Sequence, residues 1–142
     1  MSTIPQSFQH EMIFPAGRPN DAYAEYFVGN SYLGMLTTEG LGIANVTFEP
    51  GCRNNWHIHH ASEGGGQILL CTAGHGYYQE WDKPAQLLMP GSVVRIPPNV
   101  KHWHGATHES WFTHIAIEVP GKDTSTEWLE AVSPEQYGEL GF

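Results

Sequence analysis

Cysteines, basic residues and long apolar runs are all scarce in this chain of 142 residues. Its two cysteines, Cys52 and Cys71, are too few for a disulfide framework, and we interpret them as small buried apolar residues. No apolar run approaches the roughly 20 residues that a membrane-spanning helix needs. Residues 1–14 lack the basic and apolar segments of a secretory signal, so we expect a cytoplasmic protein.

The shortage of basic residues also limits the kinds of partner. Six Lys and Arg stand against 15 Asp and Glu, which gives a formal net charge of −9. The acidic excess lies in residues 1–50 and 123–142, whereas the middle of the chain is balanced. Such a surface argues against binding to nucleic acid or to an anionic membrane, so we expect a small-molecule substrate instead.

Glycine and proline are plentiful, with 16 and 10 residues, and they separate short β-rich runs. Turn residues recur every few positions and no strand–helix alternation is visible, so the pattern predicts an all-β sandwich or barrel. We expect one domain over 1–142 with its barrel core at about 27–120, including one or two entry strands within 23–38. The predicted strands are Ile43–Phe48, Gln67–Thr72, Tyr77–Trp81, Gln86–Met89, Ser92–Ile96 and Phe112–Val119.

The C-terminal residues, about 124–140, are expected to form a short helical tail that covers one edge of the barrel. Ser125–Val132 is mildly periodic and is predicted to be helical. The sequence Ser133-Pro134-Glu135-Gln136 has the pattern of a capping box with proline at the first helical position. Near the other end, residues 12–20 are expected to be irregular.

Histidines at alternating positions predict a metal site. Side chains two apart on a strand share a face, so His57 and His59 form one pair and His102 and His104 another. Gln67 opens a third strand. If these strands meet in one barrel, His57, His59, Gln67 and His102 converge on one cation. Neutral imidazoles suit first-row transition metals, and four protein ligands leave positions for water and substrate.

The fourth ligand has a competitor. Glu63 lies four residues after His59, whereas Gln67 opens a β-rich run and is followed by Gly74 seven residues on. We prefer Gln67 on strand register and interpret Glu63 as a solvated loop acid. His60 is either an alternate ligand or a residue at the mouth of the site.

Neighbouring residues are placed by the same alternation. Trp103 should point away from the metal and pack in a core or an interface. Phe48, Leu69 and Cys71 are candidates for lining the cavity, provided that their strands face inward. Each of them would then extend the apolar part of the pocket.

These residues resemble the two motifs of the cupin superfamily, G-x5-H-x-H-x3,4-E-x6-G and G-x5-P-x-G-x2-H-x3-N. The resemblance covers about residues 43–119 and implies a cupin-type double-stranded β-helix, or jelly-roll, barrel around a metal, commonly as a homodimer or homotetramer. Three departures stand out: the spacer after His59 is longer, Gln67 replaces the usual Glu, and Asn99 and Ala106 replace a Gly and an Asn. The matching positions are Gly51, His57, His59, Gly74, Gly91, Pro97 and His102.

The chain is more closely similar to small single-domain cupins with a three-His, one-Gln site, a group that includes manganese-dependent hydroxynitrile lyases. This resemblance implies manganese, with Fe, Ni or Zn as other candidates, and cyanohydrin (mandelonitrile-type) lyase activity. It also places His104 and His114 near the metal, where they either transfer protons or hold a ligand in place. The alternatives are a cupin dioxygenase, an isomerase, and a non-catalytic cupin that binds a metal or small ligand.

A glutamine ligand would change the chemistry of the site. Three imidazoles and an amide leave a divalent site at a formal charge of +2, whereas a glutamate would lower it to +1. The cation should therefore be a stronger Lewis acid and should disfavour the higher oxidation states that oxygen activation often needs. Gln67 thus favours non-redox chemistry.

Overall fold

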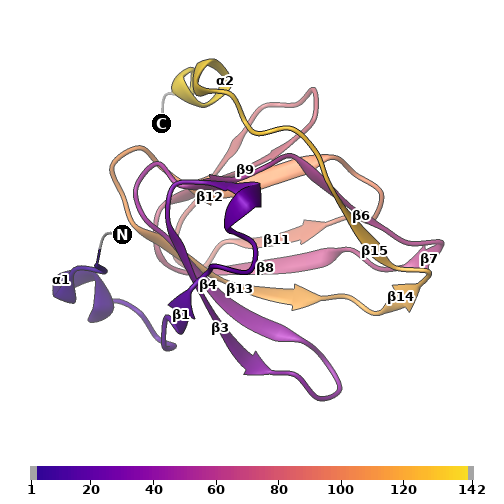
Figure 1. The fold of residues 1–142 in the computed structure, drawn as a ribbon, viewed down its shortest axis with the longest axis horizontal. Coiled ribbons are helices and arrows are strands. Elements are labelled where there is room, and N and C mark those ends of the chain that lie inside the picture. Colours follow the sequence, from indigo (N-terminus) through magenta and orange to yellow (C-terminus); the bar gives the residue numbers. More distant parts are fainter. Residues whose placement is uncertain (1–2, 141–142) are drawn as a thin grey trace.

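Antiparallel strands are the main regular elements of the computed structural model, which describes residues 3–140 and is drawn in Figure 1. One six-stranded sheet has the order β1-β3-β4-β13-β8-β11. Its strands are β1 (Arg18–Pro19), β3 (Ser31–Thr37), β4 (Ile43–Phe48), β8 (Gln67–Gly74), β11 (Val93–Ile96) and β13 (Phe112–Glu118).

A second sheet has seven strands, five of them in the order β10-β9-β12-β5-β2. Its remaining strands, β6 and β15, pair with each other, and β6 also pairs with β12. The strands are β2 (Phe27–Val28), β5 (Arg53–Asn54), β6 (His57–His60), β9 (Gly76–Glu80), β10 (Gln86–Leu88), β12 (His102–Ala106) and β15 (Ser125–Trp128). A small ladder joins β7 (Glu63–Gly64) to β14 (Gly121–Lys122), and the helical pieces are α1 (Gln6–Gln9), η1 (Ala24–Tyr26) and α2 (Pro134–Gly138).

The main core lies between the two sheets. Phe48, Leu69, Tyr78, Ile96 and Phe112 are almost completely buried there. Each large apolar side chain of this kind stabilises the fold by roughly 2–3 kcal/mol relative to an exposed position. The two-sheet barrel predicted from the turn-separated runs is therefore confirmed.

The tail differs from the prediction over its first half. Ser125–Trp128 is strand β15, which pairs with β6 from Ser125↔His60 to Trp128↔His57, so the helix predicted there is wrong. The edge of β6 satisfies the backbone of this segment, and alternation turns Thr126 and Trp128 toward the same cavity. The barrel thus extends beyond the predicted limit near residue 120.

The second half of the tail agrees with the sequence. Ser133 Oγ accepts a hydrogen bond from the backbone N–H of Gln136, and the Gln136 side chain accepts one from the backbone N–H of Ser133. Pro134 follows the cap, as predicted. Tyr137 of α2 packs against Trp103 and donates a 2.6 Å hydrogen bond to the carbonyl of Ala106, which fixes the helix on the edge of the barrel.

The N-terminal residues contain an element that was not predicted. Helix α1 follows Pro5 and buries Phe8 against Trp111, with the ring centroids 6.2 Å apart. The nearby strand β1 also lies inside the segment 12–20 that was expected to be irregular. Both elements are held by packing and pairing with residues distant in the sequence. Segments of four and two residues carry little local signal of their own.

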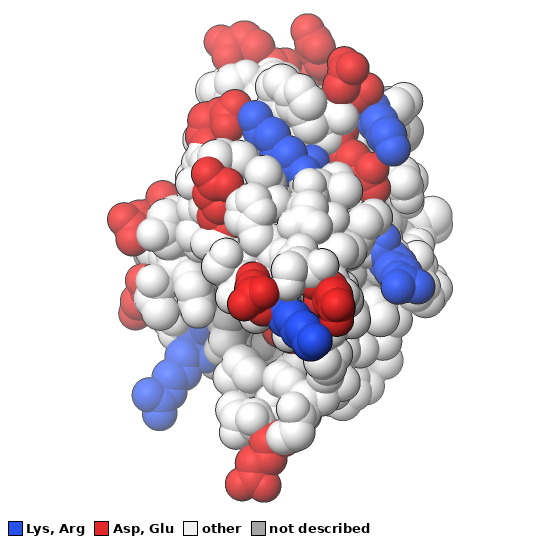
Figure 2. Space-filling view, turned by 90° about the vertical axis from the view of Figure 1, so that its right-hand side faces the viewer, with Lys and Arg blue, Asp and Glu red and all other residues white. Residues whose placement is uncertain are grey.

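Charges of both signs are dispersed over one face of the molecule. On the face shown in Figure 2, acidic side chains are spread widely and basic side chains lie among them. Within residues 3–140, no helix has both the length and the apolar character needed to cross a membrane.

Candidate metal centre

Two paired strands supply most of the histidines. On β6, His57 and His59 share the inward face, and on β12 His102 and His104 do the same. His102 lies directly opposite His57 in the β6–β12 ladder. The ring centroids are 4.2 Å apart for His57 and His102, 5.1 Å for His57 and His59, and 5.2 Å for His59 and His102. The structure therefore brings the three predicted histidine ligands together.

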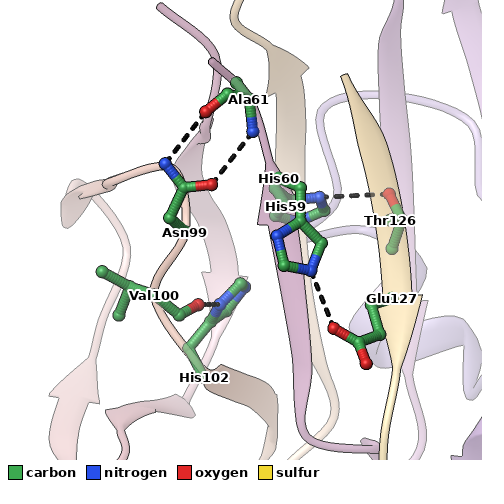
Figure 3. A network of polar contacts seen from close by, with 8 residues as sticks. All are labelled: His59, His60, Ala61, Asn99, Val100, His102, Thr126 and Glu127. Carbon is green, nitrogen blue, oxygen red and sulfur yellow. Dashed lines mark hydrogen bonds and ion pairs between the residues drawn. The ribbon is translucent and has the colours of Figure 1, made fainter. Parts of the chain in front are cut away.

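The outer nitrogen of each of these rings has a hydrogen-bond partner. Nδ1 of His57 lies 2.7 Å from the carbonyl oxygen of Asn55, and Nδ1 of His102 lies 2.9 Å from that of Val100. A carbonyl only accepts, so both Nδ1 atoms carry the hydrogen and both Nε2 atoms keep a lone pair when the rings are neutral. Nδ1 of His59 lies 3.3 Å from Thr126 Oγ1, and Figure 3 shows the contacts of His59 and His102.

The inner nitrogens of two of these histidines are buried without partners. Within residues 3–140, Nε2 of His59 and Nε2 of His102 make no hydrogen bond and are shielded from solvent. A buried acceptor without a partner is costly, and a bound cation would satisfy both. Histidines that donate Nδ1–H outward and present Nε2 inward are typical of metal ligands. The residues present therefore fit a divalent cation.

His104 extends the cluster. One ring nitrogen from each of three residues, His57, His102 and His104, lies within 4.8 Å of the other two. His104 was predicted either to transfer protons or to hold a ligand in place, and this spacing also permits it to hold a metal. Its ring, however, already has polar neighbours. Nδ1 is 3.2 Å from His114 Nε2, and both ring nitrogens lie within 3.4 Å of Asn54 Nδ2.

His114 reaches this network from the opposite sheet. The pairing of β13 with β8 shifts register between Thr113 and His114, and such irregularities commonly redirect side chains near functional sites. From His114 onward, alternate residues of β13, namely His114, Ala116 and Glu118, line the cavity.

Gln67 stands at the start of β8, at the edge of the same cavity. Its side chain is mostly buried and lies against His59. Its amide nitrogen donates a 2.9 Å hydrogen bond to Oε1 of Glu118, the residue directly opposite on β13. Gln67 is therefore near the histidines, as the strand register predicted.

The two competing residues point elsewhere. Glu63 is exposed and forms a 3.4 Å ion pair with Lys122 across the β7–β14 ladder. Nε2 of His60 lies 2.7 Å from Oε1 of Glu127 (Figure 3). Neither side chain lines the cavity.

Asn99 explains one departure from the cupin motif. Its φ is +66°, in the left-handed region that favours Gly and that Asn tolerates better than most residues. Its side chain also exchanges two 3.0 Å hydrogen bonds with the backbone of Ala61 (Figure 3). These bonds hold the loop before β12 against the end of β6, where the histidine strands meet.

Burial keeps the histidines of the centre uncharged. It lowers the pKa of His57 and His104 well below the usual range, and the neighbouring histidines add to the effect. Burial also lowers the pKa of His102 to about 4 and that of His114 to about 3. For His59 the lowering of the pKa by burial is opposed by the Glu118 carboxylate. Neutral rings are the form that binds a metal or accepts a proton.

The cavity beside the histidines has a volume of about 370 Å³ and mostly apolar walls. Trp128 stacks on His57 with ring centroids 4.6 Å apart, and it was missed because its segment was predicted to be helical. Phe48, Leu69 and Cys71 do not line the cavity; they pack deeper in the core. Asn54, Thr126 and Glu118 were also missed. The wall residues include Tyr23, Phe27, Leu33, Met35, Ala44, Val46, Ala116 and Trp128.

Comparison with known proteins agrees with this geometry. Residues 44–116 match the cupin domain family, and the chain belongs to that family. Over 94 residues it is 43% identical to an (R)-mandelonitrile lyase from Granulicella tundricola, an alignment that covers 66% of this chain and 69% of the relative.

Solved structures give the same fold. A cupin-like protein from Thermotoga maritima is 41% identical and superposes with a TM-score of 0.77, covering 89% of this chain and 94% of its own. A cupin 2 conserved barrel domain protein from Rhodopseudomonas palustris has a TM-score of 0.64 at 16% identity, covering 87% of this chain and 81% of its own. The second likeness concerns the fold alone.

Proposed function

We propose that this cupin is a metal-dependent lyase that cleaves a cyanohydrin of the mandelonitrile type into an aldehyde and cyanide. The observation that carries the proposal is the inward-facing set of histidine Nε2 atoms, two of which are buried without a partner within residues 3–140. The identity of 43% with an (R)-mandelonitrile lyase supports the choice of reaction.

The proposed ligands are His57, His59, Gln67 and His102. Each of the three histidine ligands bonds a neighbour through Nδ1, which leaves its Nε2 for the cation. His104 is assigned a different role because its ring nitrogens already face Asn54 and His114. Three imidazoles and one amide oxygen suit several divalent ions, and among them we propose manganese, with Fe, Ni and Zn as alternatives.

A bound divalent cation would supply Lewis-acid stabilisation of the negative charge that develops on the substrate hydroxyl oxygen. His114 and His104 would handle the proton. Their rings meet at 3.2 Å, so a proton accepted by one can pass to the other. Burial keeps both rings neutral at pH 7, so each offers a lone pair to the hydroxyl proton. Their low pKa values make them weak bases, so a bound cation would have to assist the transfer by lowering the pKa of the hydroxyl.

The cavity walls favour a neutral substrate with an apolar substituent. A volume of about 370 Å³ is in the range of small-molecule sites, and apolar side chains of β3, β4 and β13 form much of the wall. Trp128 and Tyr23, whose ring centroids lie 6.4 Å apart, add aromatic surface to the wall. The polar groups are concentrated at the histidine end, where the hydroxyl and nitrile would have to lie.

The test is the release of benzaldehyde and cyanide from racemic mandelonitrile. Metal-loaded wild type should exceed metal-free protein and the His57→Ala variant after subtraction of the uncatalysed rate. His60→Gln is the matched control, because His60 lies on the same strand as His57 but bonds Glu127 outside the cavity. It should retain activity. Metal-loaded protein that does no better than His57→Ala would remove the lyase proposal, and oxygen uptake with catechol-like substrates would favour an oxygenase.

A further inference from the structure

We propose that Glu118 is a positioning residue for the metal centre: it orients the Gln67 amide with its oxygen toward the histidines and supplies, one hydrogen bond away, the negative charge that the ligands lack. The hydrogen bond from Gln67 Nε2 to Glu118 Oε1 is 2.9 Å long, and the two residues are directly opposite in the β8–β13 ladder. This inference requires the metal site of the proposed function but not its cyanohydrin chemistry.

The orientation follows from what each group can donate. A glutamine amide has an accepting end and a donating end, and only the oxygen can coordinate a cation. An ionised carboxylate only accepts, so the amide nitrogen of Gln67 must face Glu118. The amide oxygen is then directed away from Glu118. Without that carboxylate, the amide can rotate and present N–H groups to the cation, which would repel it.

The charge of Glu118 is also available to the centre. Among residues 3–140, no lysine, arginine or histidine forms an ion pair with it. The carboxylate lines the cavity, and its charge acts on His59 by favouring the protonated form of the ring. It would stabilise a cation among the histidines in the same way. The side chain is exposed, so solvent screens this effect and the orienting hydrogen bond is the larger part.

The two residues can be tested as a pair. In the wild type, the Gln67 amide turns its oxygen toward the histidines and its N–H toward the Glu118 carboxylate. A glutamate at position 67 would present an oxygen to the cation in either orientation, so it would need no orienting partner. Glu118→Gln should therefore cost both orientation and charge in the wild-type background, but only charge in the Gln67→Glu background.

The experiment measures Mn²⁺ affinity by competition with a chelator, together with the visible absorption spectrum of the Co²⁺-loaded protein. A glutamine at position 118 can donate as well as accept, so it no longer dictates the orientation of the Gln67 amide. Glu118→Gln should therefore weaken Mn²⁺ binding about tenfold and should shift the Co²⁺ bands. In the Gln67→Glu background the same substitution should weaken binding much less. Glu63→Gln is the control, because Glu63 is also an exposed carboxylate but pairs with Lys122 outside the cavity.

Each result decides the inference. Affinity and Co²⁺ bands for Glu118→Gln that match those of Glu63→Gln would overturn it. An equal loss of affinity in both backgrounds would also overturn it, because a general structural defect has no reason to depend on the residue at position 67. Absence of mandelonitrile cleavage, with the difference between the backgrounds intact, would remove the lyase proposal alone. Cleavage with equal losses in the two backgrounds would remove this inference alone.

Discussion

Acidification should destabilise the metal-free protein, because its core holds histidines that are uncharged when folded. Burial lowers the pKa of His114 from 6.5 to about 3 and that of His102 from 6.5 to about 4. Between these values and 6.5, the unfolded chain binds protons that the folded chain does not, so stability falls as the pH is lowered. At pH 5, about 1.5 units below the unfolded value, each residue costs about 2 kcal/mol relative to pH 7.5.

The assay is urea denaturation of the metal-free protein at pH 7.5 and pH 5. The wild type should lose more stability than His114→Gln by about 2 kcal/mol, since that variant lacks one of the titrating groups. His75→Gln changes an exposed histidine and should keep the full pH sensitivity of the wild type. Equal losses in wild type and His114→Gln would refute the reasoning. Should His114→Gln fail to fold, proton uptake on unfolding of the wild type at pH 5 should still include about one proton from each of the two residues.

Three further predictions concern single side chains. His59→Gln should reduce the bound metal measured by elemental analysis, whereas His60→Gln should leave it unchanged, because within residues 3–140 Nε2 of His59 is buried without a partner and Nε2 of His60 bonds Glu127. Tyr137→Phe should lower the free energy of unfolding by about 1 kcal/mol in urea denaturation, through loss of the buried hydrogen bond to Ala106; an unchanged midpoint would contradict this role. Gln67→Glu should lower the rate of mandelonitrile cleavage, because it reduces the positive charge of the centre; full activity would count against a Lewis-acid role for a +2 site.

Much of the barrel could be predicted because turn residues mark the ends of its strands. Ile43–Phe48 ends at a Pro-Gly turn and matches β4 in both bounds, and β8 begins at Gln67 as predicted. The strand β15 was missed, because Ser125–Trp128 is short and mostly polar and its pairing with β6 is set by the barrel rather than by its own pattern.

In the candidate site, too, features of a single strand could be predicted and contacts between strands could not. Alternation along one strand was enough to place His57 with His59 and His102 with His104. Contacts between side chains on different strands depend on which residues pair across the sheet, and this pairing leaves no local signal in the sequence. The bond from Gln67 to Glu118 joins residues 51 positions apart. The contact between Asn54 and His104 spans 50 positions and likewise could not be foreseen.

The most direct test of the central claim is a crystal structure of metal-loaded protein with anomalous diffraction measured at the absorption edge of the metal. We predict one strong peak inside the barrel, in contact with Nε2 of His57, His59 and His102 and with the amide oxygen of Gln67. A peak coordinated by His104 in place of Gln67, or no peak among these histidines at full metal loading, would contradict it.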